Sequence, residues 1–340
     1  MRAASPAASL ALTRPVWRRA ESGSKMAWSL ERTCWQGLQV DHPPDWELVR
    51  VSGPGEPGQC LFADRHFQRL EVRWQVLGFA PRLELLIDKY RKADSKAGRS
   101  EPLEGHLAEW RGLVRHTPRG SVLQAARTIP QQRLLVEATI VWPEKREVEL
   151  ERAILSSIAA MPRGPTQSWQ AMGLSATVPG ELDLRSLSAK VGRVRWEFTA
   201  GGRPLPRIAV ERLAMPEYWL KGPLRDWLVQ EVPSGHKVLC QDLAPWNNHR
   251  AERLITRSWA GTLAALRGRR QMRLDLAWQC QIENRVYHLE FAQLSAEPDI
   301  ALPELLAVRC CRQASATANL PPGQDEAGRA ETVARTNEGC

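Results

Sequence analysis

The sequence contains no run of 18 or more apolar residues, so it offers no candidate transmembrane helix. Its seven cysteines include no Cys-x-x-Cys pair. None of its seven histidines forms a His-x-x-x-His pair or has a cysteine at metal-ligand spacing. These spacings predict no metal site and no cofactor. We expect the cysteines to be reduced thiols in a cytoplasmic protein.

Tyrosine and phenylalanine are scarce, whereas tryptophan is abundant. The chain has 3 Tyr and 5 Phe but 14 Trp in 340 residues. Tryptophan combines a large apolar surface with one N–H group, so it suits both cores and interfaces. With 43% apolar and 25% charged residues, the composition is that of an ordinary globular protein.

Positive charge exceeds negative charge, but it is not concentrated. The formal net charge is +9, and residues 1–25 hold five cations and one acid. Nucleic-acid binding requires clustered cations, so the even spread over the remaining chain argues against a nucleic-acid partner. The densest cluster is predicted to be a solvated hairpin turn, with an anion or nucleic-acid contact as the alternative. It comprises Arg267, Arg269, Arg270 and Arg273.

Both ends of the chain differ in composition from the rest. Residues 1–25 are basic and rich in small residues, loosely like a transit peptide. They are predicted to be a disordered extension, or to precede a true start at Met26. Residues 313–340 lack hydrophobic periodicity and are predicted to be a disordered tail.

Three Trp-centred signatures occur twice in the same order, which predicts a tandem repeat. The stretch around Pro162 and Pro165 is the expected boundary, giving a first module over residues 26–162 and a second over 163–312. The paired signatures are Trp35-Gln36 with Trp169-Gln170, Val72–Trp74 with Val194–Trp196, and Trp110–Gly112 with Trp259–Gly261.

Hydrophobic periodicity predicts strands and helices in both modules. An alternating pattern indicates strands, and apolar residues at helical spacing indicate helices. We therefore expect an α+β fold: two antiparallel sheets, each covered by two helices, packed as a pseudo-dimer within a monomer. The expected strands include 69–76, 122–128, 134–142, 272–280 and 286–294, and the expected helices are 83–90, 147–160, 208–227 (interrupted) and 300–311.

The opening of the first module runs Trp35-Gln36-Gly37, then Pro43-Pro44-Asp45-Trp46. This pattern and the order of elements resemble the PsbP-like fold, an antiparallel sheet between helices. Its members include extrinsic subunits of photosystems and a nuclear-import factor that binds Ran. The second module has Leu182 where Trp46 stands in the first. The resemblance implies a binding or assembly role and assigns no functional residue.

Motifs for chemistry are few. Residues 53–58 match Gly-x-Gly-x-x-Gly, but two prolines remove N–H donors and a strand-like run follows, so a hairpin loop is expected. One alternative function is an enzyme whose site is assembled across the two modules. Its candidate residues are Asp64, His66, His116 and Asp242.

The favoured function is a non-catalytic protein that binds a protein partner near the module junction. Its predicted contact residues are Trp219, Trp227 and Trp246, which occur in the second module alone. Aromatic residues of this kind often dominate protein–protein interfaces.

Overall fold

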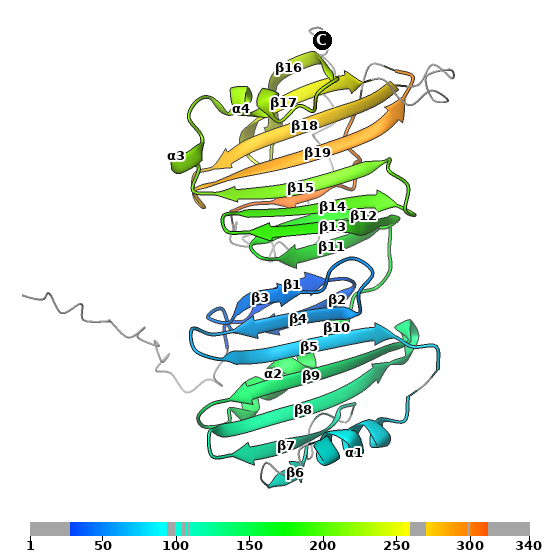
Figure 1. Ribbon diagram of the computed structural model, residues 1–340, viewed down its shortest axis with the longest axis vertical. Helices are drawn as coiled ribbons and strands as arrows, with labels where there is room; N and C mark the ends of the chain where they lie inside the picture. The colour runs from blue at the N-terminus through cyan, green and yellow to red at the C-terminus, as the bar shows by residue number, and fades with distance from the viewer. Residues whose placement is uncertain are drawn as a thin grey trace, which may run out of the picture.

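The computed structural model describes residues 28–79, 81–93, 99–103, 107, 109–258, 270–297 and 300–311. These residues form three antiparallel sheets, two of seven strands and one of six, with few helices. Two halves are stacked along the long axis, and both contribute strands to the six-stranded sheet between them (Figure 1). Within the described residues, no helix is long and apolar enough to cross a membrane.

The six-stranded central sheet joins the halves. Strand β1 pairs with β11 at Cys34 and Gln170. On each side a two-residue turn with positive φ leads into the next strand: Gln36-Gly37 into β2 and Met172-Gly173 into β12. Such turns match the twist of hairpin strands. The order across the sheet is β10 (Ala159–Ala160), β2 (Leu38–His42), β1 (Glu31–Trp35), β11 (Thr166–Ala171), β12 (Leu174–Pro179), β20 (Ala307–Arg309).

The two seven-stranded sheets share one strand order. The first runs β3 (Glu47–Val51), β4 (Gly58–Ala63), β5 (Gln68–Val76), β9 (Leu134–Trp142), β8 (Gly120–Ile129), β7 (Arg111–Thr117), β6 (Ser100–Pro102). The second runs β13 (Leu182–Lys190), β14 (Arg193–Ala200), β15 (Arg207–Ala214), β19 (Arg285–Ser295), β18 (Arg270–Cys280), β17 (His249–Ser258), β16 (Lys237–Trp246).

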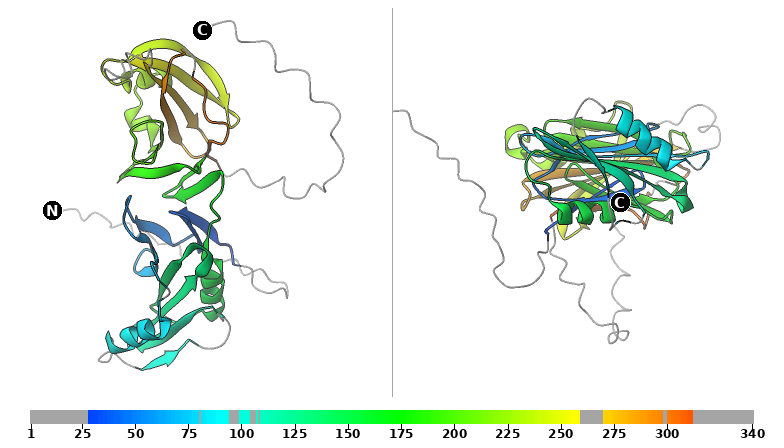
Figure 2. Two further views of the ribbon diagram at one scale, coloured as in Figure 1. Left: turned by 90° about the vertical axis from the view of Figure 1, so that its right-hand side faces the viewer. Right: turned by 90° about the horizontal axis from the view of Figure 1, so that it is seen from below.

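Helices lie on opposite sides of the first half (Figure 2). Helix α1 (Leu83–Ala93) contacts β7 and β8 of the first seven-stranded sheet, and α2 (Val148–Ser157) packs on β2 of the central sheet. In the second half, α3 (Pro216–Trp219) and α4 (Leu224–Gln230) follow β15, and α4 lies on β17 and β18. We call the face under α1 or α4 the outer face of each sheet. The opposite, inner face packs into the core.

One apolar core runs through both halves. Trp35 lies at its centre and is fully buried. Its ring meets Trp169 edge-on at a centroid distance of 5.2 Å and Trp196 at 5.6 Å. Large aromatic side chains from both halves therefore hold the junction together.

Two of the sequence matches proposed for the repeat are out of register. Leu38 and Leu174 each follow a two-residue turn, which makes them equivalent and leaves Trp169 two positions before the equivalent of Trp35. Trp74 lies on the third strand of its sheet, whereas Trp196 lies on the second strand of the other. In the third match, Trp110 precedes β7, and Trp259 lies outside the described residues.

The predicted helices are confirmed in the first half and partly wrong in the second. Helices α1 and α2 occupy the expected segments. Residues 208–214 instead belong to strand β15, which is buried on both faces and so hides the alternation that marks a strand. Of the expected helix over residues 300–311, Ala307–Arg309 form strand β20 and the rest is irregular. The α+β class therefore stands only as a sheet-rich fold with a third, central sheet that was not predicted.

Candidate functional site

An open groove lies at one end of the second seven-stranded sheet. The turn from β13 to β14, the end of β15 and helix α3 surround it, and its cavity volume is about 430 Å³. Three of its apolar side chains are solvent-exposed: Val191 completely, Tyr218 by 78% and Met215 by 46%. We call this feature the hairpin groove. Its lining residues are Val191, Gly192, Arg193, Leu213, Ala214, Met215, Tyr218 and Trp219.

Two tryptophans hold the wall of the hairpin groove in place. Trp219 is half-buried and donates its indole N–H to the carbonyl oxygen of Ala214 at 2.9 Å. The ring of Trp227 packs against it with centroids 5.6 Å apart. Because both rings are anchored, α3 is fixed on the sheet and the groove keeps its shape.

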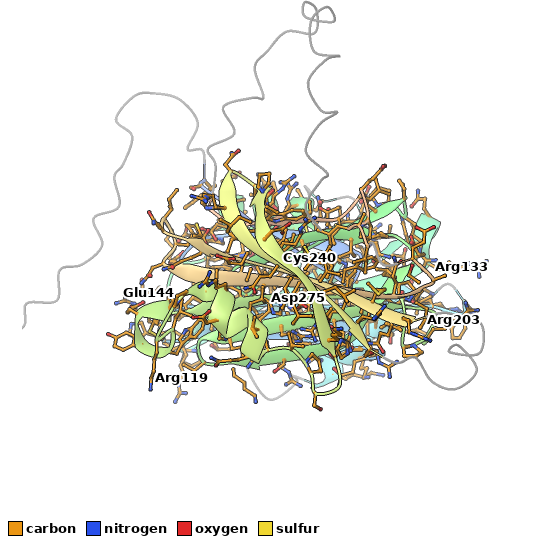
Figure 3. All side chains as sticks on the ribbon, turned by 90° about the horizontal axis from the view of Figure 1, so that it is seen from above. Arg119, Arg133, Glu144, Arg203, Cys240 and Asp275 are labelled. Atoms are coloured by element: carbon orange, nitrogen blue, oxygen red, sulfur yellow. The ribbon has the colours of Figure 1, made fainter. Side chains whose placement is uncertain are left out.

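Behind these rings, the outer face of the second sheet buries a network of charged side chains. Asp275 on β18 is 1% exposed and accepts two hydrogen bonds from Arg273, both 2.7 Å long. It also bonds the Nε2 atom of His288 at 2.8 Å. Asp275 lies within this second sheet, where Figure 3 labels it. Both carboxylate oxygens are thus engaged by cationic groups.

Two buried glutamates extend the network toward the hairpin groove. Glu290 accepts hydrogen bonds from Arg195, at 2.8 Å, and from Arg207. Glu211 accepts one from Arg193, whose partly exposed side chain also lines the groove. The groove and the network therefore share one arginine.

The network holds its members in their charged forms. Burial alone would lower the pKa of His288, but the carboxylates of Asp275 and Glu211 outweigh this effect and raise it to about 9. Burial would raise the pKa of Glu211, but His288 and Arg193 lower it to about 2. At neutral pH, His288 is accordingly an imidazolium.

The pair His288–Asp275 has the composition of an acid–base dyad, yet it is sealed. The Trp227 ring meets the His288 ring edge-on, with centroids 5.5 Å apart and planes at 82°. His288 is 2% exposed. Neither group of the pair is accessible from solvent in this structure.

The structure describes only two of the four arginines of the predicted anion cluster. Arg267 and Arg269 lie outside the described residues, and Arg270 begins β18. Arg273 is 4% exposed and bonded to Asp275, so it is not available to an external anion. For Arg273 the anion-contact interpretation is wrong, because the alternating strand places it in the covered outer face.

The candidate residues for a cross-module enzyme do not meet. Asp64 and His66 form a local turn, in which the Asp64 carboxylate accepts the His66 backbone N–H at 2.7 Å. His116 on β7 bonds Glu101, and Asp242 on β16 bonds Arg253. Strands β7 and β16 lie toward opposite ends of the molecule (Figure 1).

The predicted contact tryptophans separate into two places. Trp219 lines the hairpin groove and Trp227 supports it. Trp246 lies on β16, half-buried, with its ring 6.1 Å from that of Trp278 in the core.

Near Trp278, the fold gathers a group that sequence spacing did not reveal. His249, Cys280, Cys310 and Cys311 bring their ligand atoms within 4.8 Å of one another. Because 61 residues separate His249 from Cys310, no short motif could have signalled this cluster.

Comparison with known proteins gives structural similarity only. No family model matches the chain, and no curated protein matches it. Among solved structures, the immunity protein TplEi of T6SS from Pseudomonas aeruginosa, complexed with "L" peptide, is 12% identical with a TM-score of 0.32. That match covers 81% of this chain and 91% of the other.

Two further structures are similar at the same level. The Tle4–Tli4 complex is 15% identical over 81% of this chain and 90% of the other, with a TM-score of 0.33. Cyanobacterial PsbP (CyanoP) from Synechocystis is 16% identical, with a TM-score of 0.29. It covers 41% of this chain and 96% of its own. These TM-scores are too low to support a conclusion about function.

Proposed function

We propose that this protein is a non-catalytic binding protein whose hairpin groove receives an apolar side chain of a protein partner. The exposed Val191, Met215 and Tyr218 around this groove carry the proposal. Contiguous exposed apolar surface with an anchored aromatic wall is typical of protein-interaction sites.

The apolar patch extends beyond the groove itself. Ile282, in the turn between β18 and β19, is 82% exposed. Asn284 in the same turn donates a hydrogen bond to Glu217 of α3 at 3.0 Å, which brings this turn alongside the groove. The available surface is therefore larger than one side-chain pocket.

The charges at the rim indicate the chemistry of the partner. Lys190 lies next to Val191 in the β13–β14 hairpin and its side chain reaches solvent, whereas the charge of Arg193 is balanced by the buried Glu211. Opposite charges across an interface favour binding and its specificity. The partner we propose therefore presents a branched or aromatic side chain with acidic residues next to it.

The same proposal includes two modules of common ancestry, residues 26–162 and 163–312, with a PsbP-like character. The shared strand order of the seven-stranded sheets supports it. All lining residues of the hairpin groove belong to the second module, and we propose that the two modules have separate roles. A cytoplasmic location and a monomeric state are further parts of the proposal.

The test is site-specific crosslinking in cells that express the protein naturally. A photoreactive amino acid replaces Val191 in one form and, as the matched control, Val76 in another, since Val76 is also an exposed valine but lies at the end of β5 in the first half. We expect one protein to crosslink from position 191 and not from 76. Loss of this product in Met215→Glu would locate the contact.

Two outcomes would overturn the proposal. One is equal crosslinking from both positions. The other is an unchanged product in Met215→Glu, which replaces an exposed side chain and should change stability by less than about 0.5 kcal/mol.

A further inference from the structure

A second site lies where three strand ends of the second half meet. His249 begins β17, Cys280 ends β18, and Cys310 and Cys311 follow β20. Cys280 is buried and the other three side chains are half-buried. We call these four residues the Cys3His cluster.

We propose that the Cys3His cluster binds one Zn²⁺ ion. The Nε2 atom of His249 lies 3.1 Å from the sulfur of Cys310 and 3.7 Å from that of Cys311, and the two sulfurs are 3.9 Å apart. Zinc bonds of about 2.3 Å to sulfur and about 2.0 Å to nitrogen give tetrahedral edges of roughly 3.5–3.8 Å. His249, Cys310 and Cys311 therefore lie within a few tenths of an ångström of this geometry, and the Cys280 sulfur, within 4.8 Å of all three ligand atoms, would complete it by moving about 1 Å or less.

The donor set selects the metal and its role. Three thiolates and an imidazole are soft ligands that favour zinc over magnesium or calcium. All four positions of the tetrahedron come from the protein, which leaves no open position for water or substrate. The ion is therefore structural rather than catalytic.

A neighbouring tryptophan supports the charged form of the cluster. The indole N–H of Trp278 points to the sulfur of Cys310 at 3.3 Å. A hydrogen bond to a metal-bound thiolate stabilises its negative charge and fixes its direction. Trp278 is itself held in the core, with its ring stacked on Tyr287 at 5.5 Å.

The location explains why a metal is useful here. In the first half, helix α2 precedes the short strand β10. Ser157, the last residue of α2, accepts a hydrogen bond from the backbone N–H of Asp41 through its hydroxyl at 2.8 Å. The described residues between β19 and β20 form no such helix. Strand β20 pairs with β12 through three residues only. Zinc would tie this segment to β17 and β18.

The test is cobalt(II) titration of the full-length protein, reduced and freed of metal. We expect one equivalent to give the sulfur-to-metal charge-transfer band and the intense visible bands of tetrahedral Co²⁺, both abolished by excess Zn²⁺. Cys280→Ser should weaken binding at least tenfold. Cys34→Ser is the matched control, because Cys34 is also a buried free thiol but lies on β1.

Three results would overturn the proposal. They are a weak octahedral cobalt spectrum, equal binding by Cys280→Ser and Cys34→Ser, or a disulfide involving Cys280 in protein isolated without reductant. If Cys280→Ser does not fold, the site is tested by thermal unfolding of the unaltered protein. A chelator should lower its Tm by several degrees and Zn²⁺, but not Mg²⁺, should restore it. A Tm indifferent to both would also refute the site.

Discussion

The outer faces of the two seven-stranded sheets place different side chains on one scaffold. The β8–β9 and β18–β19 hairpins both have four-residue loops that end in a left-handed residue, Arg133 and Asn284. Counting from these loops makes Glu137 equivalent to His288, and Gln124 equivalent to Asp275. The comparison is thus fixed by strand register and not by sequence similarity.

At these equivalent positions, the first sheet is mostly neutral and the second is ionic. Gln124 faces Thr139, whereas Asp275 faces Glu290. Two carboxylates directly opposite each other would repel, and Arg273 lies between them, bonded to Asp275 and 3.5 Å from Glu290. The second face therefore requires its cations in a way that the first does not.

The helices that cover the two outer faces, α1 and α4, also make different contacts with them. Tyr90 of α1 donates its hydroxyl to Glu137, whereas Trp227 of α4 lays its ring edge against the equivalent His288. An apolar cap over charged groups removes water from them and makes each pairing depend on its neighbours. The same strand arrangement therefore carries a mostly neutral outer face in the first half and a buried ionic network behind the hairpin groove in the second.

The largest expected difference between the faces follows from removing one charge. Asp275→Ala removes the carboxylate that Arg273 and His288 share. It leaves these buried cations with only the more distant Glu290 and Glu211, and should destabilise the protein by about 3–5 kcal/mol. The substitution at the equivalent position, Gln124→Ala, should lower the free energy of unfolding by less than about 1 kcal/mol, because the side-chain amide oxygen of Gln124 has no hydrogen-bond partner. Urea unfolding of both variants measures the contrast. Similar losses would mean that the network is not stabilised by charge pairing.

A smaller effect is expected from pH. The pKa of His288 is raised to about 9, so its contribution is complete below about pH 6.5, the ordinary pKa, and is lost as pH rises through 9. The free energy of unfolding should fall by about 1–3 kcal/mol over this window. The difference between the unaltered protein and His288→Gln, measured at pH 6 and about pH 9, isolates this group. An equal fall in both proteins would mean that a group other than His288 causes the pH dependence of stability.

The smallest effect concerns the cap of the first sheet. Tyr90→Phe removes the hydroxyl that bonds Glu137 and should cost about 1 kcal/mol, since Glu137 is half-buried and can regain water. Thermal unfolding at neutral pH measures it, with Tyr218→Phe as the control because the Tyr218 side chain is exposed. A loss as large as that of Asp275→Ala would mean that the first face is as tightly coupled as the second.

Sequence patterns located several strands and the helices of the first half, and failed at β15 and β20. Alternation located β8, β9, β18 and β19, and helical spacing located α1 and α2. Strand β15 is buried on both faces, so its apolar run was mistaken for part of a helix. Residues 300–311 contain spaced leucines that suggest a helix, but Pro303 interrupts the hydrogen bonds that a helix needs.

The candidate sites could be predicted only in part. Trp219 and Trp227 stood out as aromatics confined to the second half, and they do form and support the hairpin groove. Val191 could not be identified, because an exposed turn valine has no sequence signal. The Cys3His cluster depends on strand ends that meet only after three sheets have assembled.

The antiparallel contact between β1 and β11 has a consequence for the behaviour of the first half by itself. Adjacent antiparallel strands can be related by a twofold axis, the symmetry of most protein dimers. A polypeptide carrying the first half alone would expose the edge of β1 to another copy of itself, and we expect it to dimerise there. Covalent fusion replaces that association by an intramolecular one, so the joined halves stay together at any protein concentration in the cell.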